Sequence, residues 1–502
     1  MKRAYWLLLA AAVMGSCAQV PPETQMINDA AEALGGKSKI TSITTVVLEG
    51  TGTNRNLGQN RTPEADLPVF QVTQFKRTID FANGRARQEQ TRLAVVPPGG
   101  PPAQPQQQNF GLDGDVAFNV AADGRATRQA ATVAGDRRNE FILHHPLGAV
   151  RAALDPSAKV TNPRQAGDLD VVDVTTARGD RLTLALTRST HRPASVTSMS
   201  YNVNLGDVAT ETTFGDYGTV DGLTLPKRLT SKLDKYPNTD ITISKQTVNA
   251  AATGLAAADE VKAAQAPVVT ANVTVEQVSK GLWFLTGQSH NSVLVEFADH
   301  TELIEVPQNE TRSLAVIAKA RELKPDKPLT KVIVTHHHFD HSGGIRAAIA
   351  EGLTLVTQEK NKAFIQDMAQ RKHSIVQDAL AKKPAAPKIE TVSDELTVKD
   401  ATQAMQLFRI DDPTAHSDSM LMAYFPNDKV FVQADFYNTA GAAQPRAPAL
   451  NDIIMKRKLV VAKHVPIHGP VKTQEELMKV VQSMKTPSAV AERRTKNTVA
   501  DS

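Results

Sequence analysis

The most informative segment of this chain is KVIVTHHHFDHSGG, residues 331–344. It begins with a short apolar run, Val332–Val334, which predicts a buried strand. The next residues, from His336 to His341, read H-x-H-x-D-H, and a glycine pair then leads into a predicted helix. Neutral imidazoles and a carboxylate crowded at a strand end are ligands that a divalent metal ion prefers. The stretch therefore predicts a metal site.

The spacing within this motif sorts its side chains. Alternate side chains of an extended segment share a face, so His336 and His338 can point toward the same ion. His341 breaks the alternation and can reach a different ion. His337 lies between the first two histidines, so we expect it to face away and not to bind metal.

Three later segments carry further candidate ligands. A loop, PTAHS, contains His416, a predicted strand, KVFVQAD, ends at Asp435, and a second predicted strand, VPIHG, brings His468. In this order, and together with the first motif, these segments resemble the signature of the metallo-β-lactamase superfamily. The segments GLWFLTG and NSVLVE upstream resemble the first hairpin of that family, and the resemblance covers about residues 270–485.

The resemblance implies a pair of adjacent divalent metal ions, most simply zinc, with iron and manganese as alternatives. Seven side chains would hold them: His336, His338 and His416 on the first ion, Asp340, His341 and His468 on the second, and Asp435 between the two. Asp340 would also orient a water molecule, which makes it the candidate catalytic residue.

Two positions depart from the family's pattern. Glu305, in the segment LIEVP, stands where the family usually has an aspartate that supports the metal loop. Ala415 precedes His416, where the family usually has glycine. Neither change removes a ligand.

The ligand set predicts a hydrolase. Two cations a few ångströms apart can share a water and lower its pKa from ~16 to near neutral. The resulting hydroxide would attack an ester-like, thioester, lactone or phosphoester bond of a small-molecule substrate. One alternative is a mononuclear iron enzyme that resembles persulfide dioxygenases. A second is an envelope binding protein whose metal domain is not catalytic.

The remaining histidines receive other interpretations. His290 could face the pocket, which the family's first hairpin borders, but we expect it to be structural. We expect His464 to pack within a strand or to support a ligand, and His373 to be solvated on a helix. A pair in the first half of the chain, His144–His145, has no acidic or cysteine partner at ligand spacing.

The N-terminus, MKRAYWLLLAAAV, has a basic start and a short apolar core, which predicts an export signal over residues 1–17. That core is too short to anchor the chain across a bilayer. The segment VMGSC resembles a bacterial lipobox that ends at Cys17, and cleavage after Ala18 is the alternative. We therefore expect an exported protein, either periplasmic or attached to the outer membrane through a lipid on Cys17. A single cysteine in 502 residues cannot form an intrachain disulfide.

Composition adds limits on partners. The chain is 41% apolar, which suffices for packed cores, and its formal net charge is +4. The charge becomes +2 if Lys2 and Arg3 leave with the signal, so we expect no nucleic-acid partner. The sequence does not indicate an oligomeric state.

The expected fold class is α+β, with a C-terminal αββα sandwich that follows a mainly antiparallel β domain. Alternating segments at 45–50, 70–75, 181–186 and 240–244 predict strands of the first domain. That domain loosely resembles periplasmic lipoprotein-carrier domains. The predicted division is a signal peptide over 1–17, the β domain over 18–255, a linker over 256–268, the metallo-β-lactamase-fold domain over 269–490 and a flexible tail over 491–502.

Four local features complete the prediction. The segment AEALGG, residues 31–36, predicts a helix that ends at a glycine. The proline-rich segment 97–108 predicts an exposed loop that cannot join a sheet. Helices are expected over 312–323 and 363–382, and TQEE, residues 473–476, predicts a capping box at the last helix.

Overall fold

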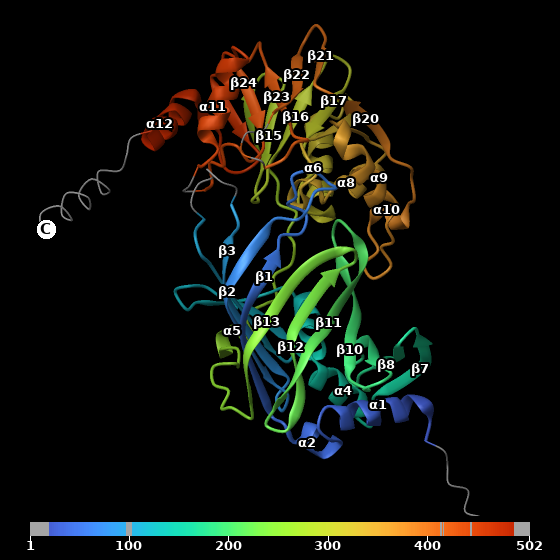
Figure 1. Cartoon of the computed structure of the whole chain (residues 1–502). Helices are drawn as coiled ribbons and strands as arrows, with labels where there is room; N and C mark the ends of the chain where they lie inside the picture. Colours follow the sequence, from blue (N-terminus) through green and yellow to red (C-terminus); the bar gives the residue numbers. More distant parts are fainter. Residues whose placement is uncertain (1–19, 97–102, 412–413, 415, 442–443, 486–502) are drawn as a thin grey trace, which may run out of the picture.

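The computed structural model describes residues 20–96, 103–411, 414, 416–441 and 444–485. The chain is an α+β protein with two parts, a large curved antiparallel sheet from the first half and an αββα sandwich from the second half (Figure 1). Among the described residues, no helix is long and apolar enough to cross a membrane.

The N-terminal part is a 13-stranded sheet in which every neighbouring pair is antiparallel. Its spatial order is β6-β5-β4-β3-β2-β1-β13-β12-β11-β10-β9-β8-β7, so the last strand returns to pair with the first. The strands are β1 (Thr45–Arg55), β2 (Val69–Asp80), β3 (Arg85–Ala94), β4 (Gln106–Asp113), β5 (Val116–Val120), β6 (Ala126–Arg128), β7 (Lys159–Ala166), β8 (Leu169–Thr175), β9 (Arg181–Thr187), β10 (Pro193–Asn202), β11 (Gly206–Val220), β12 (Leu223–Leu233) and β13 (Tyr236–Val248). All four strands expected in this half are present.

Most helices of this part cover one face of the sheet. They are α1 (Pro22–Ala33), α2 (Lys37–Ser42), α3 (Ala131–Arg137), the π-helix η1 (Arg138–Leu143) and α4 (Pro146–Leu154). The short helix α5 (Asp259–Ala263) packs on the other face, because its Val261 clusters with Phe118 of β5, whereas the preceding residue Ala117 clusters with Ala134 of α3. Ile27 of α1 and Leu147 of α4 belong to the same apolar core as Val46 and Leu48 of β1. The glycine that ends α1 is the expected one, since Gly35 has a φ of +127°, which favours glycine.

The C-terminal part contains two packed sheets. The first has seven strands in the order β14 (Thr274–Ser279), β15 (Leu282–Thr286), β16 (Ser292–Glu296), β17 (Thr301–Ile304), β18 (Leu329–Val334), β19 (Thr354–Gln358) and β20 (Lys388–Val392). The second has six, β21 (Glu395–Lys399), β22 (Ala404–Arg409), β23 (Leu421–Phe425), β24 (Val430–Gln433), β25 (Lys463–Pro466) and β26 (Lys472–Thr473). The predicted strand before the H-x-H-x-D-H motif is β18.

Helices flank the two sheets on their outer faces. They are α6 (Glu310–Leu323), α7 (Phe339–Ser342), α8 (Ile345–Ala350), the 3₁₀ helix η2 (Glu359–Asn361), α9 (Lys362–Gln370), α10 (Ala379–Lys382), α11 (Ala447–Lys456) and α12 (Gln474–Lys485). The predicted helix over 312–323 is thus confirmed as α6. The capping box is also confirmed, because the Thr473 amide donates to Glu476 Oε2 at 2.8 Å and the Glu476 amide donates to Thr473 Oγ1 at 3.2 Å.

Strand alternation explains the layers. Val293 and Val295 of β16 belong to the core cluster that also contains strands of the second sheet and the apolar residues of α11 and α12. Leu294, which points to the opposite face, joins the core beneath α6 and α8. A strand buried on both faces needs apolar residues at every position, and the sequence SVLVE nearly provides them.

Two local expectations were wrong. Gln106–Gln108 were expected in a loop, but they form the start of β4 and pair with β3. Pro105 is the last proline of that segment, so the backbone amides beyond it can join the ladder. Residues 97–102 of the predicted loop lie outside the described residues.

The helix expected over 363–382 is interrupted, since α9 ends at Gln370 and α10 begins at Ala379. The intervening chain contacts the N-terminal sheet instead: the Lys372 carbonyl accepts a hydrogen bond from the Asp207 amide at 2.8 Å. His373, expected to be solvated, is 3% exposed in this contact. Contact between the two parts of the molecule therefore overrides the helical pattern of the segment.

Candidate metal centre

The candidate ligands lie where strands of both sheets end. The H-x-H-x-D-H motif follows β18. His336 and His338 precede the single turn of α7, and Asp340 and His341 lie within it. Asp435 follows β24 directly, and His468 follows β25, which runs parallel to β24. Strand ends that meet at one edge of a sandwich bring together residues that are far apart in the sequence.

A first group consists of His336, His338 and His416. Each residue offers one ligand atom, and these atoms lie within 4.8 Å of one another. His336 and His338 are almost wholly buried, and the His338 and His416 ring centres are 4.5 Å apart. Since Zn–N bonds are about 2.0–2.1 Å long, the three imidazoles are close to the separation that one shared ion requires.

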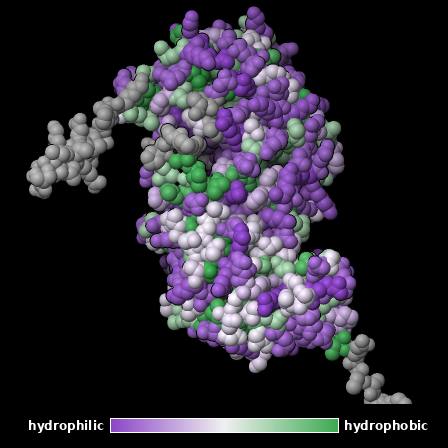
Figure 2. All heavy atoms as spheres, in the orientation of Figure 1, coloured by the Kyte–Doolittle hydropathy of each residue, from purple (hydrophilic) through white to green (hydrophobic). Residues whose placement is uncertain are grey.

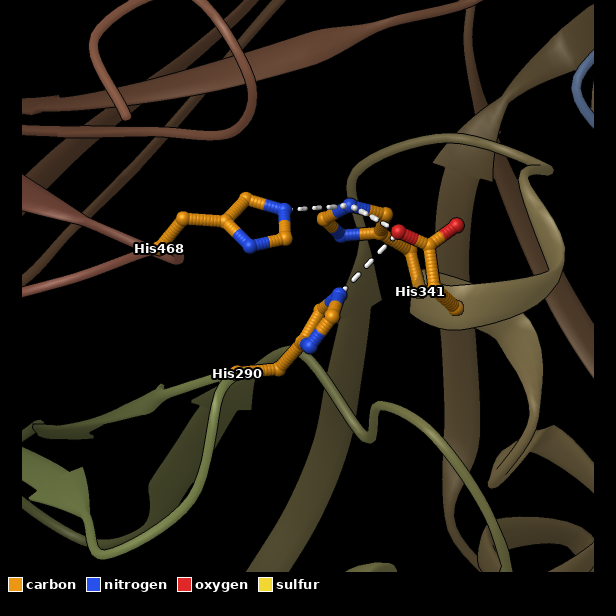
Figure 3. A group of neighbouring side chains, drawn as sticks. His290, His341 and His468 are labelled. Carbon is orange, nitrogen blue, oxygen red and sulfur yellow. Dashed lines mark hydrogen bonds and ion pairs between the residues drawn. The ribbon is translucent and has the colours of Figure 1, made fainter. Parts of the chain in front are cut away.

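A second group consists of Asp340, His341, His468 and also His290. The Nε2 atoms of His341 and His468 are 3.2 Å apart, and Asp340 Oδ2 lies 3.6 Å from His341 Nε2. His290 Nε2 lies 3.1 Å from the same Asp340 oxygen. Figure 3 shows the three labelled imidazoles approaching from three different segments of the chain.

Asp435 lies between the two groups. Its Oδ2 is 3.3 Å from His336 Nε2, 3.0 Å from His341 Nε2 and 3.3 Å from His416 Nε2. Its Oδ1 is 2.9 Å from His468 Nε2. One carboxylate therefore faces histidines of both groups, as a bridging ligand must. The backbone of Asp435 is left-handed, with a φ of +63°.

Glu305 fixes the motif from behind. The Thr335 amide donates to Glu305 Oε1 at 2.8 Å, and His341 Nδ1 lies 3.3 Å from Glu305 Oε2. Because Nδ1 of His341 faces this carboxylate, its Nε2 is directed toward Asp340 and Asp435. The glutamate thus takes the supporting position that the family resemblance implied for an aspartate.

Burial and the carboxylates of the site shift the pKa values of its histidines in opposite directions. Burial and the neighbouring imidazoles lower the pKa of His336 and His338, so both are neutral and offer lone pairs. Burial acts in the same direction on His341, but Asp435, Asp340 and Glu305 outweigh it and hold the pKa of His341 well above its usual value. The pKa of Asp435 is well below its usual range, because its contacts with His341 and His416 outweigh burial.

The residues fit a pair of divalent cations. His336 Nε2 is buried and makes no hydrogen bond to any described residue, although it lies beside the Asp435 carboxylate. Nitrogen and carboxylate oxygen donors are the set used by zinc, iron and manganese sites. A cation would also take the place of the proton that the three carboxylates hold on His341.

All seven residues predicted as ligands come together, and His290 is an eighth residue that the sequence reasoning left out. It was expected to be structural, but it lies within the second group. Its neighbour Asn291 donates through Nδ2 to the carbonyls of Pro466 and Gly469, on both sides of His468. A histidine beside such an anchoring asparagine, in the hairpin that borders the site, was the available signal.

The other motif and strand histidines lie as expected. His337 belongs to none of the three candidate groups found among the described residues and is held by Ser419 Oγ and the Asn60 carbonyl. His464 is buried on β25, and its Nε2 lies 2.7 Å from Gln474 Oε1.

Known proteins resemble the C-terminal part of the chain. Residues 285–436 match the family model of the metallo-beta-lactamase superfamily, a range that includes every predicted ligand except His468. No curated protein matches the chain.

The solved structures that resemble this part are metallo-beta-lactamases with low sequence identity to this chain. One from Pontibacter korlensis is 17% identical and covers 43% of this chain and 100% of its own, with a TM-score of 0.33. The DIM-1 enzyme is 14% identical over 42% of this chain and 95% of its own, with a TM-score of 0.32. FIM-1 from Pseudomonas aeruginosa, in a mono-zinc form, is 17% identical over 43% and 97%, with a TM-score of 0.31. On the family match, the segment that builds the candidate metal centre is a domain of the metallo-beta-lactamase superfamily.

Proposed function

We propose that this protein is an exported hydrolase that uses two divalent metal ions, zinc in the first instance. It would cleave an ester-like, thioester, lactone or phosphoester bond of a small molecule. The observation that carries this proposal is the position of Asp435, whose two oxygens face histidines of both candidate groups. A centre for a single ion would need no carboxylate shared in this way.

Two ions held by these groups would lower the pKa of a water between them and polarise the bond to be broken. Asp340 is the residue placed to orient that water. Its side chain is 37% exposed, whereas those of His341 and Asp435 are 0% and 14% exposed. It is thus the ligand most open to solvent and substrate, and its Oδ2 faces the second group.

The second group also favours hydrolysis over the mononuclear iron alternative. A single-ion enzyme could use His336, His338 and His416 alone. Here the second group contributes imidazoles and a carboxylate of its own, and Glu305 holds His341 in position.

Metal analysis and a substrate panel test the proposal. Wild-type protein should contain close to two ions per chain and should hydrolyse at least one member of a panel of esters, thioesters, lactones, phosphodiesters and β-lactams. His338→Ala should lose at least one ion and the activity. His191→Ala, at an exposed histidine of the first half, serves as the matched control and should change neither.

Metal-free protein with full activity would contradict the proposal. One iron per chain, with oxygen consumed on a persulfide and no hydrolysis, would favour the dioxygenase alternative. Bound metal without any turnover would favour the binding-protein alternative.

We further propose attachment to the outer membrane through a lipid on Cys17, a residue outside the described range. Fractionation of the native host should place the wild type in the membrane and Cys17→Ala in the periplasm. A wild type that is soluble in the periplasm would favour cleavage after Ala18, and one in the cytoplasm would contradict export.

A further inference from the structure

The loop between β1 and β2, residues 56–68, leaves the N-terminal sheet and reaches the metal centre of the other part of the molecule (Figure 1). We call it the β1–β2 loop. The Asn60 side chain fixes its shape, because Nδ2 donates to the carbonyls of Thr62 at 2.6 Å and Pro63 at 2.9 Å. Asn60 is 5% exposed, so the centre of the loop is buried in the contact.

Consecutive residues of this loop hold the H-x-H-x-D-H motif. The Gly58 carbonyl accepts a hydrogen bond from the Phe339 amide at 3.2 Å. Gln59 Nε2 donates to Asp340 Oδ1 at 2.8 Å. The Asn60 carbonyl accepts from His338 Nε2 at 3.0 Å and also from His337 Nε2 at 2.8 Å, as described above.

The loop also holds the segment that supplies the third histidine of the first group. Arg61 Nε lies 2.7 Å from Asp418 Oδ1, and the Asp418 amide donates to the Arg61 carbonyl at 3.0 Å. Asp418 is two residues beyond His416. The loop thereby ties together the two chain segments that build the first group.

These contacts use one polar atom of each candidate ligand and would leave the other for a cation. Because His338 Nε2 donates to the Asn60 carbonyl, Nδ1 is left to bind a cation. Because Asp340 Oδ1 accepts from Gln59, Oδ2 is left for the second group, where it meets His290 and His341. Hydrogen bonds of this kind orient metal ligands and set the tautomer of a ligating histidine.

We infer that the β1–β2 loop of the N-terminal sheet is a structural component of the metal centre. Gln59 and the Asn60 carbonyl position one ligand of each ion, so the superfamily domain without the N-terminal part is incomplete. This inference rests on the proposed function. The alternative is a loop that blocks the site, but the loop occupies no ligand atom that faces the other ligands, and Asp340 remains partly exposed.

Two variants of the full chain test the loop: one removes a single hydrogen bond, and the other displaces the backbone. Gln59→Met keeps the length of the side chain and removes the donor to Asp340. Gly58→Ala displaces the loop, because Gly58 has a φ of +71° and a Cβ there would lie 2.2 Å from the Phe339 ring. Asp234→Asn is the matched control, since it weakens another contact between the two parts, the 2.9 Å ion pair with Arg371, away from the ligands.

Zinc affinity is the primary measurement, by competition with a chromophoric chelator, with thermal unfolding to verify the fold. Outer hydrogen bonds contribute about 10–100-fold to metal affinity. We therefore expect about tenfold weaker binding for Gln59→Met, a larger loss for Gly58→Ala and less than twofold change for Asp234→Asn. The visible spectrum of the cobalt-substituted protein should change in the same two loop variants.

The outcomes separate this inference from the proposed function. If the wild type binds two ions and both loop variants bind zinc as tightly as it does, the inference fails and the proposed function stands. If the loop variants gain activity at unchanged affinity, the loop blocks the site and the inference is again wrong. If the wild type binds no metal, both fail.

Discussion

Each half of the molecule buries histidines, and His341 in the C-terminal part behaves in the opposite way to His144 and His145 in the N-terminal part. In the N-terminal part, His144 lies between two hydroxyls, with Nδ1 2.9 Å from Thr212 Oγ1 and Nε2 2.9 Å from Ser198 Oγ. Burial, aided by the cation of Arg77, lowers the pKa of His144 to about 4 and that of His145 to about 3.

In the C-terminal part, His341 is equally buried, but three carboxylates raise its pKa. Burial alone therefore yields a neutral histidine that packs. Only converging carboxylates turn buried histidines into a site for cations. On the face shown in Figure 2, hydrophilic residues dominate the C-terminal part and residues of mixed hydropathy cover the N-terminal part.

We expect the largest effect from Asp435→Asn, which removes the charge shared by both ligand groups. We expect the loss of tight binding for both ions and a fall in activity of more than about 100-fold, since even outer-shell changes cost about 10–100-fold. Metal content after gel filtration and turnover measure the effect. His144→Gln, the corresponding change in the other half, should leave the metal content intact. Two retained ions in Asp435→Asn would show that the carboxylate does not bridge.

Glu305→Gln keeps the acceptor for the Thr335 amide but removes the charge behind His341. We expect about tenfold weaker binding of one ion, and little effect on the other, because His341 is the candidate ligand that lies beside the Glu305 carboxylate. Titration with zinc and a chelator should resolve two unequal steps. Equal weakening of both steps would contradict the division of the ligands into two groups.

The pH dependence of stability tests the buried histidines of the N-terminal part. The folded-state pKa of His145 is depressed to about 3, so below about pH 6.5 the unfolded chain binds a proton that the folded chain does not. Stability is therefore present above pH 6.5 and is lost as pH falls toward the folded pKa, by about 1.4 kcal/mol per pH unit for this group.

His145→Leu tests this directly, because the buried imidazole makes no hydrogen bond to any described residue. The variant should lose that part of the pH dependence and gain relative stability at pH 5. Urea unfolding at pH 7, 6 and 5, with hydrogen exchange in β10 and β11, provides the measurement. A slope unchanged from wild type would mean that His145 is protonated in the fold.

The smallest expected effect is that of His290→Gln, which alters one contact of Asp340. A single hydrogen bond contributes about 0.5–1.5 kcal/mol, so turnover should fall by no more than about tenfold. The variant should still bind two ions per chain, as the wild type is expected to do. If the variant loses one ion outright, His290 is a ligand and the second group has four members.

The sequence predicted that these seven candidate ligands would come together, because the motifs are local and specific. H-x-H-x-D-H occupies six consecutive residues, and Asp435 and His468 each follow a short apolar strand. The sequence did not reveal His290, whose role depends on a hairpin anchored beside His468 through Asn291. It also misassigned segment 371–378, where contact with the N-terminal sheet outweighs helical periodicity.

Residue types and their spacing along the chain were enough to predict the strand pattern, the two-part organisation and the chemistry of the candidate ligands. Which atoms of these residues meet depends on the folded structure. Gln59 and Asn60 lie more than two hundred residues before the motif, and nothing in NLGQN distinguishes an ordinary turn from the support of His338 and Asp340. Hydrogen bonds between distant segments leave no local pattern, because their geometry exists only when both parts have folded and packed together.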